Sequence, residues 1–292
     1  MNTTTSADRT GSSAWLQAQY DNRARVPEHP SILARWAAES ARVRQSPRCQ
    51  IDLRYGDGPA QTLDLFMPDR GVGDAPVIVF IHGGWWRALD KSDHSFVAPA
   101  FTRSGALVVV PNYALCPAVT IETIALQMAH AVAWAWRHAS SLGADPARIV
   151  VAGHSAGGQL AALLLTCQWP RLGADLPARL LRGAMAISGV FDLAPLRRTA
   201  FLQRDLRLTA ASVRRLSPAG MACPAAPLIA LAGADDSSEF HRHRRLIRRA
   251  WGHAAVPVNE AIAGTNHFTV LDELARPGSR VHRLALGLLR SD

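Results

Sequence analysis

The chain has 292 residues, of which 48% are hydrophobic, so it can form one large domain or two small ones with a substantial core. Its net charge of +9 comes almost entirely from arginines spread along the chain, without the interleaved aromatic residues of a nucleic-acid-binding module. No apolar run approaches the roughly 20 residues of a membrane span, and no secretory signal follows Met1. We therefore expect neither nucleic acid nor membrane as a partner. The four scattered cysteines indicate reduced thiols in a cytoplasmic protein without a metal site.

The first part of the chain is predicted to be helical. Residues 1–14 are small and polar, and we expect them to be disordered. From Trp15 to about Arg44, apolar residues recur at helical spacing in two pieces, which predicts an N-terminal helical arm over residues 15–48. Two alternating segments follow at 49–55 and 61–67, with a Gly- and Pro-containing turn between them, and they predict a β-hairpin.

Continuous apolar runs then alternate with helical segments. Runs without alternation indicate strands buried on both faces, as in a parallel sheet. The predicted strands are 76–81, 106–110, 148–152, 181–188, 227–232 and 256–263. The predicted helices are 92–104, 121–140, 158–165, 239–251 and 280–290. This order predicts a doubly wound, mostly parallel α/β sheet with an antiparallel start, in a single domain over 15–292.

Residues 192–224 do not fit this alternation. They lie between two predicted strands, are too long for one crossover helix, and carry Arg and Leu at helical spacing. We expect a helical insertion near the carboxyl-terminal edge of the sheet, where a lid would lie.

The sequence Gly153-His154-Ser155-Ala156-Gly157 separates a predicted buried strand from a predicted buried helix. In that context, G-x-S-x-G is typical of a nucleophile elbow. Side chains at positions 153 and 157 would collide with the neighbouring strand or helix, so the turn requires glycine there. We expect Ser155 to stand on a strained turn with its hydroxyl exposed, as a nucleophile.

A serine nucleophile needs a base, and the base needs an acid. Asp235 and Asp236 directly follow the predicted strand 227–232, and His267 follows the last predicted strand. Because parallel strands end at one sheet edge, these side chains are predicted to lie near Ser155. The order Ser, acid, His is that of α/β-hydrolases. The residues alone leave the choice between Asp235 and Asp236 open.

The loop after the first buried strand reads His82-Gly83-Gly84-Trp85-Trp86. Its two glycines let backbone N–H groups turn toward a substrate oxygen, and the N–H of Ala156 is the other expected donor of an oxyanion hole. Since Trp85 and Trp86 directly follow the glycines, we expect at least one to wall the acyl pocket. Gly83 and Trp86 are the remaining candidate pocket residues.

Several motifs resemble those of the arylformamidase (kynurenine formamidase) group of α/β-hydrolases, from about residue 20 to the end. They are H-G-G-W-W-R-A-L-D-K-S-D at 82–93, G-H-S-A-G-G-Q-L at 153–160, S-G-V-F-D-L at 188–193, D-S-S-E-F-H-R at 236–242 and N-H-F at 266–268. The resemblance implies the α/β-hydrolase fold, Asp236 as the catalytic acid, and Gly84 and Trp85 as oxyanion donors beside Ala156. One departure is His243, where the family often has Gln.

The resemblance also implies a reaction. Ser155, Asp236 and His267 would cleave an aryl formamide such as N-formyl-L-kynurenine, a step of tryptophan catabolism, to formate and an arylamine without a cofactor. An arginine of 192–224 is the expected partner of that substrate's carboxylate. A carboxylesterase for short acyl chains is the alternative. A non-catalytic binding protein is disfavoured, because such proteins usually lose a triad member. Whether the chain forms a homodimer stays open.

Overall fold

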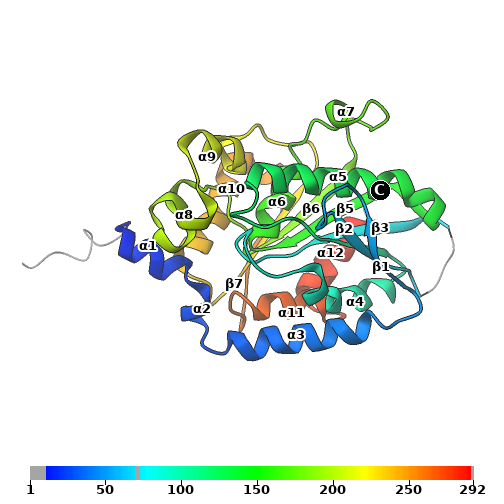
Figure 1. Cartoon of the computed structure of the whole chain (residues 1–292), viewed down its shortest axis with the longest axis horizontal. Coiled ribbons are helices and arrows are strands. Elements are labelled where there is room, and N and C mark those ends of the chain that lie inside the picture. The colour runs from blue at the N-terminus through cyan, green and yellow to red at the C-terminus, as the bar shows by residue number, and fades with distance from the viewer. Residues whose placement is uncertain (1–10, 70–72, 291–292) are drawn as a thin grey trace, which may run out of the picture.

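A central sheet organises the structure, a computed structural model that describes residues 11–69 and 73–290. Eight strands pair in the order β1-β2-β4-β3-β5-β6-β7-β8 (Figure 1). They are β1 (Cys49–Arg54), β2 (Thr62–Phe66), β3 (Ala75–Ile81), β4 (Leu107–Pro111), β5 (Ala144–His154), β6 (Leu181–Ile187), β7 (Leu228–Gly233) and β8 (Asn259–Ile262). β1 pairs with β2 and β2 with β4 in antiparallel register, and all other pairs are parallel. The predicted hairpin and the predicted parallel sheet are both confirmed.

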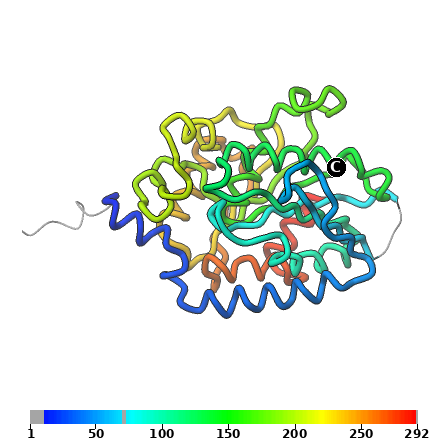
Figure 2. The backbone as a smooth tube through the Cα atoms, viewed as in Figure 1, coloured from blue at the N-terminus to red at the C-terminus, as the bar shows by residue number. Residues whose placement is uncertain are grey.

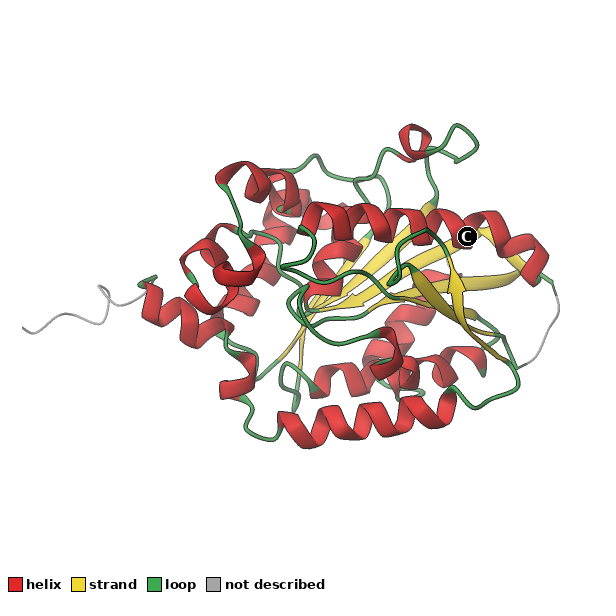
Figure 3. Cartoon of the chain, viewed as in Figure 1, coloured by secondary structure: helices red, strands yellow, loops and turns green. Residues whose placement is uncertain are grey.

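Helices cover both faces of the sheet (Figure 3). The α-helices that follow the N-terminal arm are α4 (Ala98–Thr102), α5 (Ile121–Ala139), α6 (Ala156–Leu164), α7 (Trp169–Leu172), α8 (Ala200–Leu206), α9 (Ala210–Leu216), α10 (Ser238–Ala255), α11 (Thr269–Ala275) and α12 (Arg280–Arg290). α5, α6 and α10 contribute to the core on one face, and α4, α11 and α12 to the core on the other. None of the helices among the described residues is long and apolar enough to cross a membrane.

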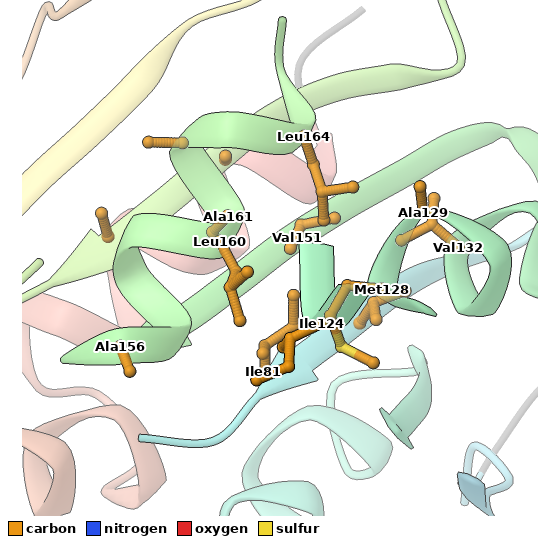
Figure 4. Packing of buried hydrophobic residues seen from close by; sticks show 14 of the residues in the cluster. Ile81, Ile124, Met128, Ala129, Val132, Val151, Ala156, Leu160, Ala161 and Leu164 are labelled. Atoms are coloured by element: carbon orange, nitrogen blue, oxygen red, sulfur yellow. The ribbon is translucent and has the colours of Figure 1, made fainter. Parts of the chain in front are cut away.

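Because helices cover both faces of the sheet, the strands are continuous apolar runs in the sequence. In β3, Val77, Val79 and Ile81 belong to the core under α5 and α6, whereas Ile78 and Phe80 belong to the opposite core. Figure 4 shows the first of these cores, where side chains of β3 and β5 meet those of α5 and α6. Because successive side chains of a strand point to opposite faces, a strand between two cores must be apolar at every position.

The N-terminal arm consists of α1 (Ser13–Tyr20), α2 (Asn22–Arg25) and α3 (His29–Val43). Of the predicted disordered segment 1–14, residues 1–10 lie outside the described residues. α1 begins at Ser13, two residues before the predicted helical start, because the Ser12 side chain accepts the Trp15 N–H as an N-cap. α1 lies beside α8, from a distant part of the sequence (Figure 2).

Two helical predictions differ from the structure. The expected helix 92–104 is divided into two 3₁₀ turns, Lys91–Asp93 and Ser95–Val97, and the short α4. Asp90 and Asp93 form a capping box around the first turn, and Pro99 stands in the first turn of α4, where proline is tolerated but cannot continue a preceding helix. α11 was missed because two turns are too short to show a helical period.

Candidate active site

Ser155 stands between β5 and α6 in a backbone conformation that serine rarely adopts, with φ 55° and ψ −116°. A Cβ at Gly157 would lie 2.1 Å from the carbonyl oxygen of Ile81, and one at Gly153 would lie 2.1 Å from that of Gly157. The predicted collision with the neighbouring strand and helix is therefore confirmed. Strain of this kind persists only where the surrounding structure holds it, and it is common at functional sites.

The loops after β7 and β8 bring an acid and a histidine to this serine. His267 Nε2 lies 3.1 Å from Ser155 Oγ, and His267 Nδ1 lies 2.9 Å from Asp236 Oδ1. A carboxylate only accepts, so Nδ1 carries the proton and Nε2 is free to accept the serine hydroxyl proton. All three side chains are buried, whereas Asp235 is exposed and makes no ion pair with the histidine. The geometry thus selects Asp236 over its neighbour.

Asp236 is held on its other oxygen as well. Its Oδ2 accepts the Ser188 hydroxyl at 2.6 Å and the Gly233 N–H at 3.1 Å. Burial raises the pKa of Asp236, but the charge of His267 and the hydrogen bonds from His267 and Ser188 outweigh burial and leave the pKa below its usual value. The carboxylate therefore stays ionised. The sequence does not predict a role for Ser188, because nothing in its motif indicates a hydrogen bond to Asp236, which lies 48 residues later in the chain.

The loop after β3 presents backbone N–H groups beside Ser155. Gly84, Trp85 and Trp86 have φ values of 104°, 53° and 56°, three left-handed residues in succession. Within the described residues, the amides of Gly84, Trp85 and Ala156 donate no hydrogen bond. Unpartnered amides at a strained loop and a helix start are suited to an oxyanion.

A cavity of about 420 Å³ opens above Ser155 and His267. Its walls come from the N-terminal arm, the loop after β3 and α8. Besides Ser155 and His267, the lining residues are Tyr20, Asp21, Asn22, Arg23, Leu33, Trp36, Gly84, Trp85, Arg87, Ala88, Leu89, His154, Phe201, Asp205 and Phe268. A volume of this size suits a small organic molecule, and the aromatic side chains suit a planar ring.

Two predictions about these walls are wrong. Gly83 and Trp86 do not line the cavity. Trp86 is fully buried in the core, where its Nε1 donates to Gln159 Oε1 at 3.2 Å, and only Trp85 faces the cavity. No arginine of 192–224 lines it either. Among the arginines that line the cavity, Arg87 contacts this segment: it binds the Asp205 carboxylate and donates to the Phe201 carbonyl at 2.9 Å.

The L-D-K-S-D stretch anchors the loop from behind. Lys91 is 3% exposed, and its Nζ lies 2.6 Å from Asp52 Oδ1 and 2.7 Å from Asp64 Oδ1. Asp64 is fully buried and also binds Arg44. A buried carboxylate between two cations is strongly held, since removing either partner would leave buried charge uncompensated. This cluster ties the loop to β1 and β2.

Comparisons with known proteins agree with this geometry. Residues 63–193 match the family described as BD-FAE. The chain is 26% identical to kynurenine formamidase of Danio rerio, over 85% of this chain and 84% of that protein. It is 28% identical to kynurenine formamidase of Drosophila melanogaster, over 79% and 78%. The chain is an α/β-hydrolase, and it is similar to kynurenine formamidases over most of its length. A solved structure from a Silicibacter species, provisionally named a thioesterase, is 30% identical with a TM-score of 0.81, over 91% of this hydrolase and 97% of that chain.

One departure of this hydrolase from its family is explained by the structure. His243 stands where the family often has Gln, and its Nδ1 accepts the Phe191 N–H at 3.2 Å. Its Nε2 therefore carries the proton and donates to the Tyr20 hydroxyl at 3.0 Å, which donates to Glu239 at 2.7 Å. A glutamine amide, with one acceptor and one donor end, could make the same two bonds. The ring of Tyr20 packs edge-on against Trp85, so this network supports the cavity wall.

Two further buried histidines of this hydrolase are His154, which lines the cavity, and His94. His154 Nε2 lies 2.7 Å from the carbonyl oxygen of His267, and the ring of His94 packs at a tilt against those of Trp36 and Phe96. Burial lowers the pKa of both His94 and His154 to about 3, helped by neighbouring histidines. Both rings are therefore neutral at physiological pH, and His154 donates a hydrogen bond that fixes the main chain of His267.

Proposed function

We propose that this hydrolase cleaves an aryl formamide, with N-formyl-L-kynurenine as the representative substrate, through a serine acyl-enzyme. The observation that carries the proposal is the hydrogen-bonded series Ser155–His267–Asp236 at the floor of an aromatic cavity, beside three unpartnered amides. The kynurenine formamidases that it resembles over most of its length supply the substrate class.

Each group has a defined role in this mechanism, and His267 acts in both steps. His267 Nε2 takes the Ser155 proton as the oxygen attacks the formyl carbon, and Asp236 stabilises the resulting imidazolium. The amides of Gly84, Trp85 and Ala156 bind the oxyanion. His267 then returns the proton to the leaving arylamine, and the formyl group stays on Ser155. A water molecule deprotonated by His267 attacks this ester, and formate leaves.

The insertion 192–224 is proposed to act as a lid. It supplies Phe201 and Asp205 to the cavity wall, and Arg87 joins it to the oxyanion loop. A lid in this place would exclude water from the acyl-enzyme's surroundings while the arylamine departs.

A substrate panel tests the proposal. Ser155→Ala should lower kcat on N-formyl-L-kynurenine by about 10⁴-fold or more, because removal of the nucleophile removes the covalent route. The wild-type protein should hydrolyse this substrate and formanilide with higher kcat/KM than phenyl acetate. A circular dichroism spectrum equal to that of the wild type would show that the variant is folded.

The opposite preference would change the substrate class. Fast hydrolysis of phenyl acetate without cleavage of either formamide would refute the formamidase assignment and favour a short-chain esterase. The 30% identical relative that is named a thioesterase gives that alternative its support.

Ser188→Ala tests how Asp236 is held. The substitution removes the 2.6 Å hydrogen bond to a charged acceptor, a type of bond that contributes roughly 1.5–3 kcal/mol. We expect kcat to fall about tenfold while KM stays within twofold, since the ground-state contacts are unchanged. Ser237→Ala is the matched control, because the hydroxyl of Ser237 is buried without a hydrogen-bond partner. An equal loss in both variants would mean that Ser188 acts on packing alone.

A further inference from the structure

The wall formed by α2 carries a polar side chain whose hydrogen bonds are unmet. Asn22 is 5% exposed and lines the cavity that contains Ser155. Its side-chain amide makes no hydrogen bond to any of the described residues. Its polar atoms are accessible from the cavity, so water or a polar group of a ligand can be their partner.

The next residue, Arg23, adds an unpaired charge to the same wall. Four charged side chains other than those of the Ser–His–Asp series line the cavity, namely Asp21, Arg23, Arg87 and Asp205. Arg87 and Asp205 neutralise each other, and Asp21 accepts the Ala24 N–H as the N-cap of α2. Arg23 makes no ion pair or hydrogen bond with any residue in the described ranges. The cavity therefore has one cation that is free to bind a ligand.

We propose that Asn22 and Arg23 form a subsite for a carboxylate at the end of the substrate remote from the scissile bond. This inference rests on the proposed function and names the substrate class more closely. A guanidinium presents two parallel N–H donors that match a carboxylate, and the Asn22 NH₂ supplies a further donor. Asp21 on the same wall disfavours a dianion such as a phosphate monoester. The N-terminal arm, rather than the lid, then selects acidic substrates.

The position of α2 suits this role. Tyr20, two residues before it, is bound to Glu239 and packs against Trp85, and Val26, directly after it, is buried in the core. α2 is therefore fixed at both ends. The backbone that carries Asn22 and Arg23 therefore loses little conformational freedom when the ligand binds.

Paired substrates test the subsite. Arg23→Gln should raise KM for N-formyl-L-kynurenine at least tenfold and leave kcat within twofold, because uniform binding is lost. KM for the corresponding carboxamide should change less than twofold. Asn22→Ala should shift KM in the same direction by a smaller factor. Arg25→Gln is the matched control, since Arg25 lies on the same helix with the same charge and does not line the cavity.

A second pair separates failure of the subsite from failure of the formamidase assignment. An acetate ester of a phenol that bears a carboxylate side chain, and its carboxamide, should show the same selective effect of Arg23→Gln. If only the esters are cleaved and the selectivity persists, the formamidase proposal fails and the carboxylate subsite stands. Equal KM changes for charged and neutral partners, or no change for either, would overturn the subsite.

Discussion

Asp236→Asn is expected to lower kcat by about 10³- to 10⁴-fold while the protein stays folded. An asparagine can donate to His267 Nδ1, which favours the tautomer with the proton on Nε2, and that nitrogen could then no longer accept the Ser155 proton. The imidazolium formed in the transition state would also lose its negative partner. Measured kcat values for the two proteins on the best substrate of the panel would check the size of the loss.

The neighbouring residue gives a control of the same chemistry. Asp235→Asn removes one negative charge from the same loop, but Asp235 is exposed and does not contact His267. We expect its kcat to stay within twofold of the wild type. A large loss in Asp235→Asn with a small loss in Asp236→Asn would reverse the assignment of the acid.

The free energy of unfolding is expected to fall by about 3 kcal/mol between pH 6.5 and pH 5 through two buried histidines. In the folded protein, burial lowers the pKa of His94 and His154 to about 3, whereas an unfolded histidine has a pKa of about 6.5. Below pH 6.5 the unfolded chain therefore binds protons that the folded protein does not. Each histidine costs about 0.7 kcal/mol per pH unit at pH 6.5, and the slope approaches about 1.4 kcal/mol per unit near pH 5. His243, whose pKa burial also lowers, acts in the same direction.

Urea unfolding at a series of pH values measures this effect. His94→Phe removes one titrating ring and should reduce the loss over this interval by about 2 kcal/mol. His130→Phe is the control at an exposed position, and its pH dependence should equal that of the wild type. Parallel curves for wild type and His94→Phe would show that His94 does not contribute to acid sensitivity.

Much of the fold is predictable because the sheet is buried on both faces. The continuous apolar runs of β3, β4 and β7 have no other ready explanation, since no helix in the described ranges could cross a membrane. The structure of segment 92–104 is less predictable from its sequence. The Asp90–Asp93 capping box and Lys91, whose side chain reaches across to β1 and β2, override its helical pattern. Contacts of that kind leave no periodic trace in the sequence.

In the candidate site, too, some residues are predictable from the sequence and others are not. Ser155, Asp236 and His267 follow the ends of parallel strands, so topology alone predicts that they meet. The walls of the cavity come from elements that no strand order places, such as α2 and α8. The sequence therefore predicts the substrate-binding arginine in the insertion 192–224, but Arg204 of this insertion is exposed and its Arg215 binds Glu122. The cavity receives Arg23 from the opposite end of the sequence instead.

Lys91 has a practical consequence beyond its role behind the oxyanion loop. It is the only lysine among 292 residues, and its amine is enclosed between two carboxylates. Amine-reactive dyes and cross-linkers that target lysine have no accessible lysine on the native surface. Modification of Lys91 would therefore report the opening of the structure, so mass spectrometry of labelled peptides could time the release of this one segment as the protein unfolds.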